Sequence, residues 1–290
     1  MITESDLALA DGRTLHVYDS GGEDRLTVCW HHGTPNIGTP PLPLFSESER
    51  LGVRWVSYDR PGYGGSTPHA DRDVASAAGD VAAVVDALGI DRFAVMGHSG
   101  GGPHALACAA LLPERVLGVV SMAGPAPYDA EGLDWFAGMA DAGVASQRAA
   151  AQGREARQAY ADSGAEGDIG FTSADMAALS GEWSWLLDVV RPAIAAGPGP
   201  HIDDDLASVA PWGFDPAQIV APALFLHGGE DRVVPSTHSE WLARRCPSTE
   251  LRLLPHDSHI TVLNFGAAAL RWLSAQATQP HPPKAQGEQP

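Results

Sequence analysis

The stretch AVMGHSGGGPHALACAA, residues 94–110, decides the interpretation of this chain, because it places one serine hydroxyl between two apolar runs. Residues 93–96 are typical of a buried strand, and the alanine-rich run after the glycines is typical of a helix. Glycines on either side of Ser99 allow a tight strand-to-helix turn, which strains the serine backbone and exposes its hydroxyl. The new helix directs N–H groups towards the same point. This G-x-S-x-G pattern predicts a nucleophilic serine.

The composition sets limits on the class of protein and on its partners. The 290 residues are 44% hydrophobic, which is enough for one large core with a modest insertion. A formal charge of −18 disfavours a nucleic-acid partner. Three scattered cysteines form neither a disulfide framework nor a metal-binding spacing. No secretory leader and no apolar run of about 18 residues is present, so we expect a cytoplasmic protein with a small-molecule substrate and no membrane partner. The oligomeric state stays open.

Short apolar runs alternate with helix-length segments along most of the chain. Such runs are typical of strands that are covered on both faces in a parallel sheet, and they occupy residues 26–30, 53–59, 93–97, 116–124, 223–228 and 251–255. Helical patterns occupy residues 73–89, 100–112 and 236–246, and an amphipathic hairpin is predicted at 7–20. The alternation predicts an α/β fold, with a mostly parallel central sheet flanked by helices.

One long segment interrupts this alternation. Residues 125–215 begin and end with turn-rich sequence and contain helix-like patterns but no convincing strand. We therefore predict a core formed by residues 1–124 and 216–275, with a helical cap, or lid, inserted at 125–215. The polar, proline-rich residues 276–290 predict a disordered C-terminal tail.

Three further motifs follow predicted strands. They are VCWHHGTPN at 28–36, ALFLHGGEDRVVP at 223–235 and LLPHDSHITVL at 253–263. With GHSGG at 97–101, they make the sequence similar to the α/β-hydrolase superfamily, in the branch with a helical cap, across roughly residues 5–275. The resemblance implies the α/β-hydrolase fold and a catalytic triad in the chain order serine, acid, histidine.

The resemblance assigns the triad to Ser99 as nucleophile, Asp231 as acid and His259 as base. A nucleophilic serine needs a base, and that base needs an orienting carboxylate. Ser258 stands where many relatives have glycine before the histidine. Other acidic residues and one other histidine compete for these roles in the sequence: Asp215, Glu230, Asp257 and His256.

The same resemblance suggests residues that would surround the nucleophile. The H-G-x-P motif implies an oxyanion hole formed by the backbone N–H groups of Thr34 and Gly100, with His32 holding the loop in place. The segment YDRPGYGGSTP at 58–68 resembles a loop beside the site, where Asp59 and Arg60 would be structural. Candidate substrate-binding residues are the variable residue of the serine motif, His98, and three aromatic residues of the predicted cap, Trp135, Trp183 and Trp185. The alternative is that the aromatic residues of the cap form a small core of its own.

Together these motifs predict a serine hydrolase that cleaves a small to medium carboxylic ester through an acyl-enzyme. We expect neither a metal ion nor an organic cofactor. Alternatives are a proline iminopeptidase-like aminopeptidase, a cofactor-free haloperoxidase or perhydrolase, and a ligand receptor built on the hydrolase fold. Epoxide hydrolases and haloalkane dehalogenases share the H-G-x-P motif, but they carry an aspartate where this chain has Ser99.

Overall fold

The computed structural model describes residues 1–22, 25–165, 167–195 and 197–278. Eight strands form one sheet in the order β1-β2-β4-β3-β5-β6-β7-β8. β1 and β2 pair antiparallel and β2 joins β4 antiparallel, whereas the pairings from β4 through β8 are parallel. The strand bounds are β1 (Thr3–Ala8), β2 (Thr14–Asp19), β3 (Leu26–His31), β4 (Val53–Tyr58), β5 (Phe93–His98), β6 (Val116–Met122), β7 (Ala223–Gly228) and β8 (Thr249–Leu254).

The sheet confirms the predicted α/β class, with small differences at strand ends. β6 ends at Met122 rather than at 124, because Ala123 takes a left-handed backbone conformation with φ of 50° that turns the chain away from the sheet. β8 begins at Thr249, two residues before its predicted start. The first two residues of this edge strand are polar and exposed, so they carry no apolar signal.

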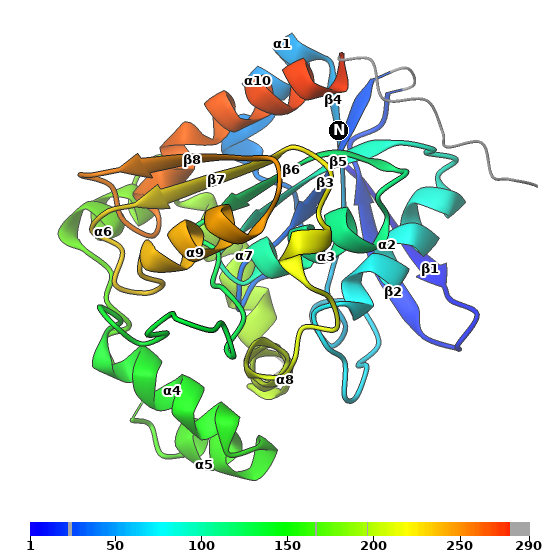
Figure 1. Cartoon of the computed structure of the whole chain (residues 1–290). Coiled ribbons are helices and arrows are strands. Elements are labelled where there is room, and N and C mark those ends of the chain that lie inside the picture. The colour runs from blue at the N-terminus through cyan, green and yellow to red at the C-terminus, as the bar shows by residue number, and fades with distance from the viewer. Residues whose placement is uncertain (23–24, 166, 196, 279–290) are drawn as a thin grey trace, which may run out of the picture.

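Helices cover both faces of the sheet (Figure 1). α1 (Phe45–Leu51) and α10 (Gly266–Ala277) contact each other on one face, where α10 packs against β6. The other face is covered by α2 (Ser76–Ala87), α3 (Gly101–Leu111) and α9 (Thr237–Arg245). There α3 packs against β3, β5 and β6, α2 packs against α3, and α9 packs against β7 and β8. One buried apolar cluster lies on each face. α3 is buried over nearly its whole length, so the helix that follows the proposed nucleophile is held rigidly.

Within the described residues, five α-helices lie between β6 and β7: α4 (Asp141–Ala151), α5 (Arg154–Asp162), α6 (Ser173–Leu179), α7 (Trp185–Ala195) and α8 (Gly199–Val209). The short 3₁₀ helix η2 (Pro216–Gln218) follows them. α4, α5 and α8 contact one another, and α4 and α5 project away from the sheet in Figure 1. α7 behaves differently, because its buried side chains belong to the same apolar cluster as those of β3 and α10. The inserted segment therefore combines an outlying part with a part that completes the core.

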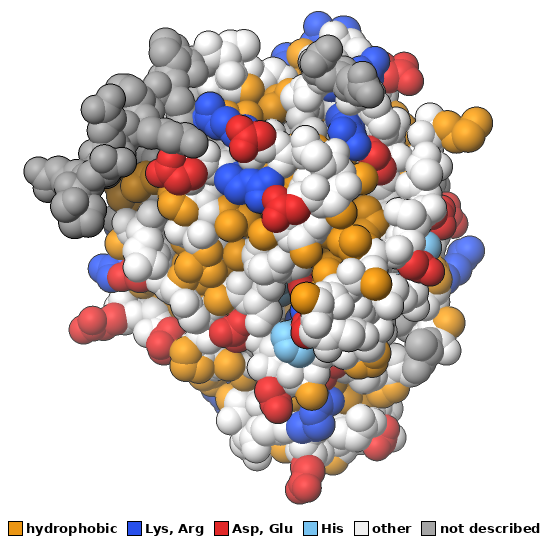
Figure 2. Space-filling view, turned by 90° about the vertical axis from the view of Figure 1, so that its right-hand side faces the viewer, with side chains coloured by type: hydrophobic (Ala, Val, Ile, Leu, Met, Phe, Trp, Pro, Cys, Tyr) orange, Lys and Arg blue, Asp and Glu red, His pale blue; other side chains and the backbone are white. Residues whose placement is uncertain are grey.

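Acidic side chains are scattered over the face shown in Figure 2, and several lie beside basic ones. In the described ranges, no helix is long and apolar enough to cross a membrane. The predicted tail was wrong for residues 276 and 277, which belong to α10, and residues 279–290 of that prediction lie outside the described residues.

Candidate active site

Ser99 occupies the predicted turn between β5 and α3. Its φ of 53° is in the left-handed region, which is strained for a non-glycine residue, and its N–H donates to the Met122 carbonyl at 2.8 Å. The flanking glycines are required by close approach: a Cβ on Gly97 would collide with the Gly101 carbonyl, and one on Gly101 would collide with the His31 carbonyl. The turn therefore holds the hydroxyl in a single direction above the sheet edge.

The structure brings Ser99, His259 and Asp231 together. Nε2 of His259 lies 2.9 Å from Oγ of Ser99, and Nδ1 of His259 lies 2.8 Å from Oδ2 of Asp231. Asp231 follows β7 and His259 follows β8, so both arrive at the carboxyl edge of the sheet where β5 delivers the serine. A carboxylate only accepts hydrogen bonds, so Nδ1 carries the proton and Nε2 accepts from the serine hydroxyl. Asp215, one of the competing acids, instead pairs with Arg245 at 2.7 Å.

Asp231 is buried and held by the backbone. Its Oδ1 accepts hydrogen bonds from the N–H groups of Val233 at 2.8 Å and Val234 at 2.9 Å. Burial by itself raises the pKa of this carboxyl, but the charge of His259 and the nearby His227 outweigh burial, and the pKa of Asp231 lies below its ordinary value. The group is therefore an anion at neutral pH and stabilises a positive charge on His259.

The loop that carries His259 is tied to α6 of the inserted segment. Oδ1 of Asp175 accepts from the N–H of Ile260 at 2.7 Å, from the N–H of Thr261 at 3.1 Å and from the Ser258 hydroxyl at 2.7 Å. Ser258, which departs from the glycine of many relatives, thus contributes a hydrogen bond that glycine cannot make. These contacts orient the histidine loop.

The loop after β3 is tied to the inserted segment by a second carboxylate. Asp204 of α8 accepts from the Thr34 hydroxyl at 2.5 Å and from the Tyr63 hydroxyl at 2.9 Å. It also pairs with Arg60 and with Arg72, each at 2.6 Å. Burial raises the pKa of Asp204, but the charges of Arg60 and Arg72 outweigh burial and hold this pKa well below its ordinary value.

Arg60 and His32 connect this network to the loop backbone. Nη2 of Arg60 donates to the Gly33 carbonyl at 3.0 Å, and the backbone N–H of Arg60 donates to Nε2 of His32 at 3.0 Å. Nδ1 of His32 donates to the Gly33 carbonyl at 2.8 Å. Thr34 lies against Gly100, where a Cβ would collide with the Thr34 hydroxyl. The two residues proposed for the oxyanion hole are therefore adjacent, and both line the same cavity as Ser99.

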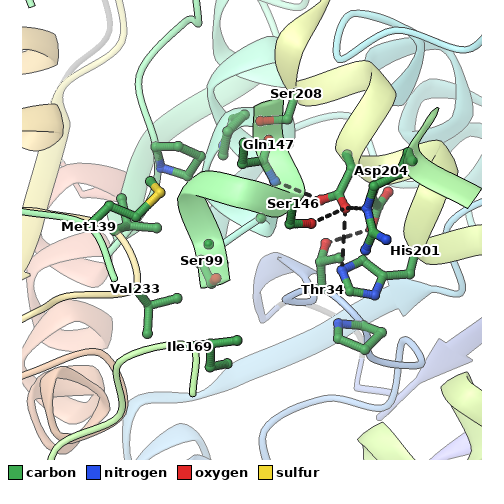
Figure 3. A pocket seen from close by; sticks show the side chains of 18 of the residues that line it. Thr34, Ser99, Met139, Ser146, Gln147, Ile169, His201, Asp204, Ser208 and Val233 are labelled. Atoms are coloured by element: carbon green, nitrogen blue, oxygen red, sulfur yellow. Dashed lines mark hydrogen bonds and ion pairs between the residues drawn. The ribbon is translucent and has the colours of Figure 1, made fainter. Parts of the chain in front are cut away.

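That cavity has a volume of about 210 Å³ and two different sides. In Figure 3, Met139, Val233 and Ile169 lie on one side of Ser99. The polar residues labelled on the other side are Thr34, Ser146, Gln147, Asp204, His201 and Ser208. The nucleophile therefore lies between an apolar half and a polar half.

The four predicted substrate-binding residues divide into one that lines the cavity and three that do not. Trp135 is among the lining residues. Trp183 and Trp185 pack in the apolar cluster beside the sheet, where Nε1 of Trp183 donates to Asn264 at 2.6 Å. His98 is buried, and its Nε2 donates to the His259 carbonyl at 2.9 Å. Aromatic residues in the inserted segment were thus assigned to the pocket although two of them stabilise the core.

Several residues of the site carry no sequence signal. Asp175 and Asp204 are two among 36 acidic residues. The Thr172-x-x-Asp175 spacing marks the start of α6, but neither carboxylate has a local pattern that points to the loop it binds. Arg60 lies in the recognised motif at residues 58–68, but its ion-pair partner Asp204 lies 144 positions away in the sequence. Across the described ranges, no cluster of three or more histidine, cysteine or acidic side chains is arranged to hold a metal ion.

Comparisons with known proteins agree with this architecture. A family model described as alpha/beta hydrolase fold matches residues 27–265. The chain is 30% identical over 286 residues, covering 92% of this chain and 97% of the other, to a Caulobacter sp. (strain K31) protein with the provisional name carbamate hydrolase RutD. It is also 30% identical over 275 residues to the non-heme chloroperoxidase of Streptomyces lividans, covering 88% of this chain and 95% of that enzyme.

Solved structures show the same fold at lower identity. The enol-lactonase of Burkholderia xenovorans LB400 superposes with a TM-score of 0.70 at 20% identity, covering 95% of this chain and 100% of that one. The family match covers most of the chain and spans every strand from β3 to β8. The protein therefore belongs to the alpha/beta hydrolase family.

Proposed function

We propose that this protein is a serine hydrolase that cleaves a small to medium carboxylic ester through an acyl-enzyme. The observation that carries the proposal is the hydrogen-bonded chain from Asp231 through His259 to Ser99, which opens onto a cavity. Nucleophilic attack on a carbonyl carbon requires a buried carboxylate, an oriented imidazole and a hydroxyl that substrate can reach, and the half-buried Ser99 lines the cavity.

In the proposed reaction, Nε2 of His259 takes the proton as Oγ of Ser99 bonds to the ester carbonyl carbon. The carbonyl electron pair moves to oxygen and forms a tetrahedral oxyanion. When the oxyanion collapses, the carbon–alkoxy bond breaks and the alcohol leaves with the proton from His259. Water, deprotonated by the same imidazole, then attacks the acyl-serine and releases the acid. Asp231 remains ionised throughout and stabilises the imidazolium.

The N–H groups of Thr34 and Gly100 would stabilise the oxyanion. Donors of this kind are effective only when they are fixed in advance, and losing one typically costs about 10²–10³ in rate. The contacts of Asp204 and Arg60 with the 32–34 loop support such preorganisation. In this proposal Asp204 of the inserted segment holds the 32–34 loop in place and makes no contact with the reacting atoms.

The cavity and the relatives favour an ester of limited size. A volume of about 210 Å³ is below the range of roughly 300–1,000 Å³ that is typical for drug-sized ligands. The apolar half around Met139, Val233 and Ile169 suits a short hydrocarbon chain. Structural neighbours include an enol-lactonase and an esterase from Thermogutta terrifontis, and lactones are themselves cyclic carboxylic esters.

A second candidate is perhydrolysis, because the bifunctional esterase/perhydrolase of Acinetobacter calcoaceticus is 39% identical to this chain over 95 residues. Here hydrogen peroxide replaces water and attacks the acyl-serine, which yields a peracid and free Ser99. Both candidates share the acyl-enzyme, so peracid formation from an ester and peroxide, measured against acid formation in the same sample, separates them.

Labelling by a fluorophosphonate probe tests the nucleophile. We expect the wild-type protein to be labelled and to hydrolyse short p-nitrophenyl esters, and Ser99→Ala to lose both while keeping the wild-type melting temperature. Ser184→Ala, at an exposed serine of the inserted segment, is the matched control and should be labelled normally. Labelling of Ser99→Ala would identify another nucleophile and overturn the proposal.

A further inference from the structure

His104 places an unused hydrogen-bond acceptor beside the cavity. This residue of α3 lines the cavity and is only 5% exposed. Its Nδ1 lies 2.7 Å from the Gly100 carbonyl, which can only accept, so Nδ1 carries the proton. Burial lowers the pKa of His104 to about 3, so the ring is neutral and Nε2 is a bare acceptor. Nε2 has no hydrogen-bond partner among the described residues.

Gln147 of α4 provides a second unused acceptor on the polar side of the same cavity (Figure 3). Its Nε2 donates to Oδ1 of Asp205 at 2.8 Å, and this contact fixes the orientation of the amide because a carboxylate cannot donate. Oε1 is left buried with no partner in the described parts of the chain. Buried polar atoms in folded proteins are nearly always paired, so two such acceptors around one cavity require an explanation.

Three donors on the same side are already engaged by carboxylates of α8. The Thr34 hydroxyl donates to Asp204 at 2.5 Å. Ser146 and Arg157 both donate to Oδ2 of Asp205, at 3.3 Å and 2.6 Å. The two carboxylates, Asp204 and Asp205, thus take up donors, while the acceptors of His104 and Gln147 remain. Among the described residues, the polar half therefore offers two unused acceptors to a ligand that donates hydrogen bonds.

We propose that the polar half of the cavity binds a hydroxyl or N–H group of the substrate, through Nε2 of His104 or Oε1 of Gln147. The inference rests on the proposed ester hydrolysis and narrows its substrate class to esters that carry a hydrogen-bond donor near the scissile bond. The apolar half takes the hydrocarbon part. His104 and Gln147 are thereby specificity-determining residues, and a single hydroxyl, which has one hydrogen to donate, uses one of them at a time.

The expected preference follows from the two costs of omitting the donor. An ester without it forgoes a hydrogen bond and also leaves a buried acceptor unpaired. We expect a preference in kcat/KM of about tenfold or more for the donor-bearing ester over its hydrocarbon isostere. An ether in place of the hydroxyl accepts but cannot donate, so it should be no better than the hydrocarbon.

Two matched substrate series test this preference, because the donor could belong to the alcohol or to the acid. The alcohol series is 2-hydroxyethyl, 2-methoxyethyl and propyl butanoate, followed by acid release. The acyl series is the p-nitrophenyl ester of 3-hydroxybutanoate, 3-methoxybutanoate and 3-methylbutanoate. A preference for the hydroxyl compound over both others in either series supports the proposal, and the series that shows it identifies the end of the substrate that faces His104 and Gln147.

Variants then assign the acceptor. Gln147→Met keeps the side-chain length and removes the acceptor, and His104→Phe keeps a planar ring and removes Nε2. We expect the hydroxyl-to-hydrocarbon ratio of kcat/KM to fall towards one in whichever variant lacks the acceptor in use. Gln152→Met is the matched control, because Gln152 follows the same helix but is exposed and binds the Arg148 carbonyl, so its ratio should equal that of the wild type.

The outcomes separate this inference from the proposed function. Hydrolysis of all the esters with equal kcat/KM, or an unchanged ratio in both Gln147→Met and His104→Phe, would overturn the donor-binding site and leave the serine hydrolase intact. Failure to hydrolyse any of the esters, together with labelling of Ser99→Ala, would overturn the proposed function itself.

Discussion

The sheet and the inserted segment contribute to the site in different ways. The sheet supplies Ser99, His259 and Asp231 from turns that directly follow β5, β8 and β7. The inserted segment supplies Asp175 from α6 and Asp204 from α8, which bind the loops next to those turns. The sheet residues form the proposed reacting chain, whereas the two carboxylates of the inserted segment hold neighbouring backbone in place.

The charges of the two regions match these roles. Asp231 faces His259, whose imidazole takes up and returns a proton in the proposed reaction. Asp204 faces two arginines, Arg60 and Arg72, which keep their charge under all ordinary conditions. Asp231 can therefore stabilise an imidazolium that forms during the proposed reaction. Asp204 instead binds two guanidinium groups whose charge does not change, so it holds structure and takes no part in proton transfer. Substitutions in the two regions should therefore differ in kind as well as in size.

Asp231→Asn should have the largest effect. The amide can donate to Nδ1 of His259 and so favours the wrong imidazole tautomer, and the equivalent change in a serine protease lowers kcat by about 10⁴. We expect a similar loss of kcat for p-nitrophenyl ester hydrolysis, with little change in KM. Asp257→Asn is the control among the competing acids and should keep near-normal activity. Near-normal activity of Asp231→Asn together with a large loss in Asp257→Asn would identify Asp257 as the acid and contradict the proposed role of Asp231.

Asp204→Asn should have a smaller effect on activity and a clear effect on stability. A displacement of about 1 Å in the 32–34 loop would lower kcat by roughly 10²-fold. Losing the countercharge of Arg60 and Arg72 should lower the free energy of unfolding by about 3 kcal/mol. Urea titration and steady-state kinetics measure the two effects. Asp203→Asn, on the same helix but paired with the exposed Arg154, should change stability by less than about 1 kcal/mol.

The stability difference at Asp204 should depend on pH. Because its pKa is depressed in the folded chain, the unfolded chain takes up a proton at this carboxyl at higher pH than the folded chain does. The stabilisation is complete above the ordinary carboxyl pKa of about 4 and is lost as the pH falls through the folded value. We therefore expect the wild-type advantage over Asp204→Asn to be constant above about pH 5 and to shrink as the pH falls below about 4. An advantage that stays constant in acid would contradict the ion-pair role.

Ser258→Ala should have the smallest effect. It removes one of the three donors of the histidine loop to Asp175 and leaves the N–H groups of Ile260 and Thr261 in place. We expect the free energy of unfolding to fall by about 1.5 kcal/mol, as for a hydrogen bond to a charged group, and kcat to change less than about threefold. Thermal melting and kinetics measure both. Ser180→Ala, at the exposed C-terminal end of α6, should match the wild type.

The apolar runs and the motif order were sufficient to predict the sheet and the three side chains that meet at its edge. Each of these residues directly follows a strand, and parallel strands bring their carboxyl ends to one edge whatever the rest of the chain does. Gly97 has to be glycine for a local reason, since a Cβ there would collide with the Gly101 carbonyl, whereas Gly101 is required by the His31 carbonyl of the distant strand β3. The predicted start of the edge strand β8 was less accurate, because its first two residues are polar and exposed and carry no apolar signal.

Local sequence was insufficient for the inserted segment. Trp183 and Trp185 were assigned to the pocket, but they pack beside the sheet, because a buried aromatic has the same sequence signal in either place. Asp204 could not be distinguished from other acidic residues, because its partners Thr34 and Arg60 lie 170 and 144 positions away.

The fold class follows from the sequence, because apolar runs and tight turns are local properties of the chain. The order of the proposed nucleophile, acid and base came from the resemblance to the α/β-hydrolase superfamily. Only the tertiary structure decided which carboxylates hold the two loops, which tryptophan lines the cavity, and which acceptors of its polar half stay unpaired. Those properties depend on contacts between segments far apart in the chain, and on burial, which no local pattern specifies.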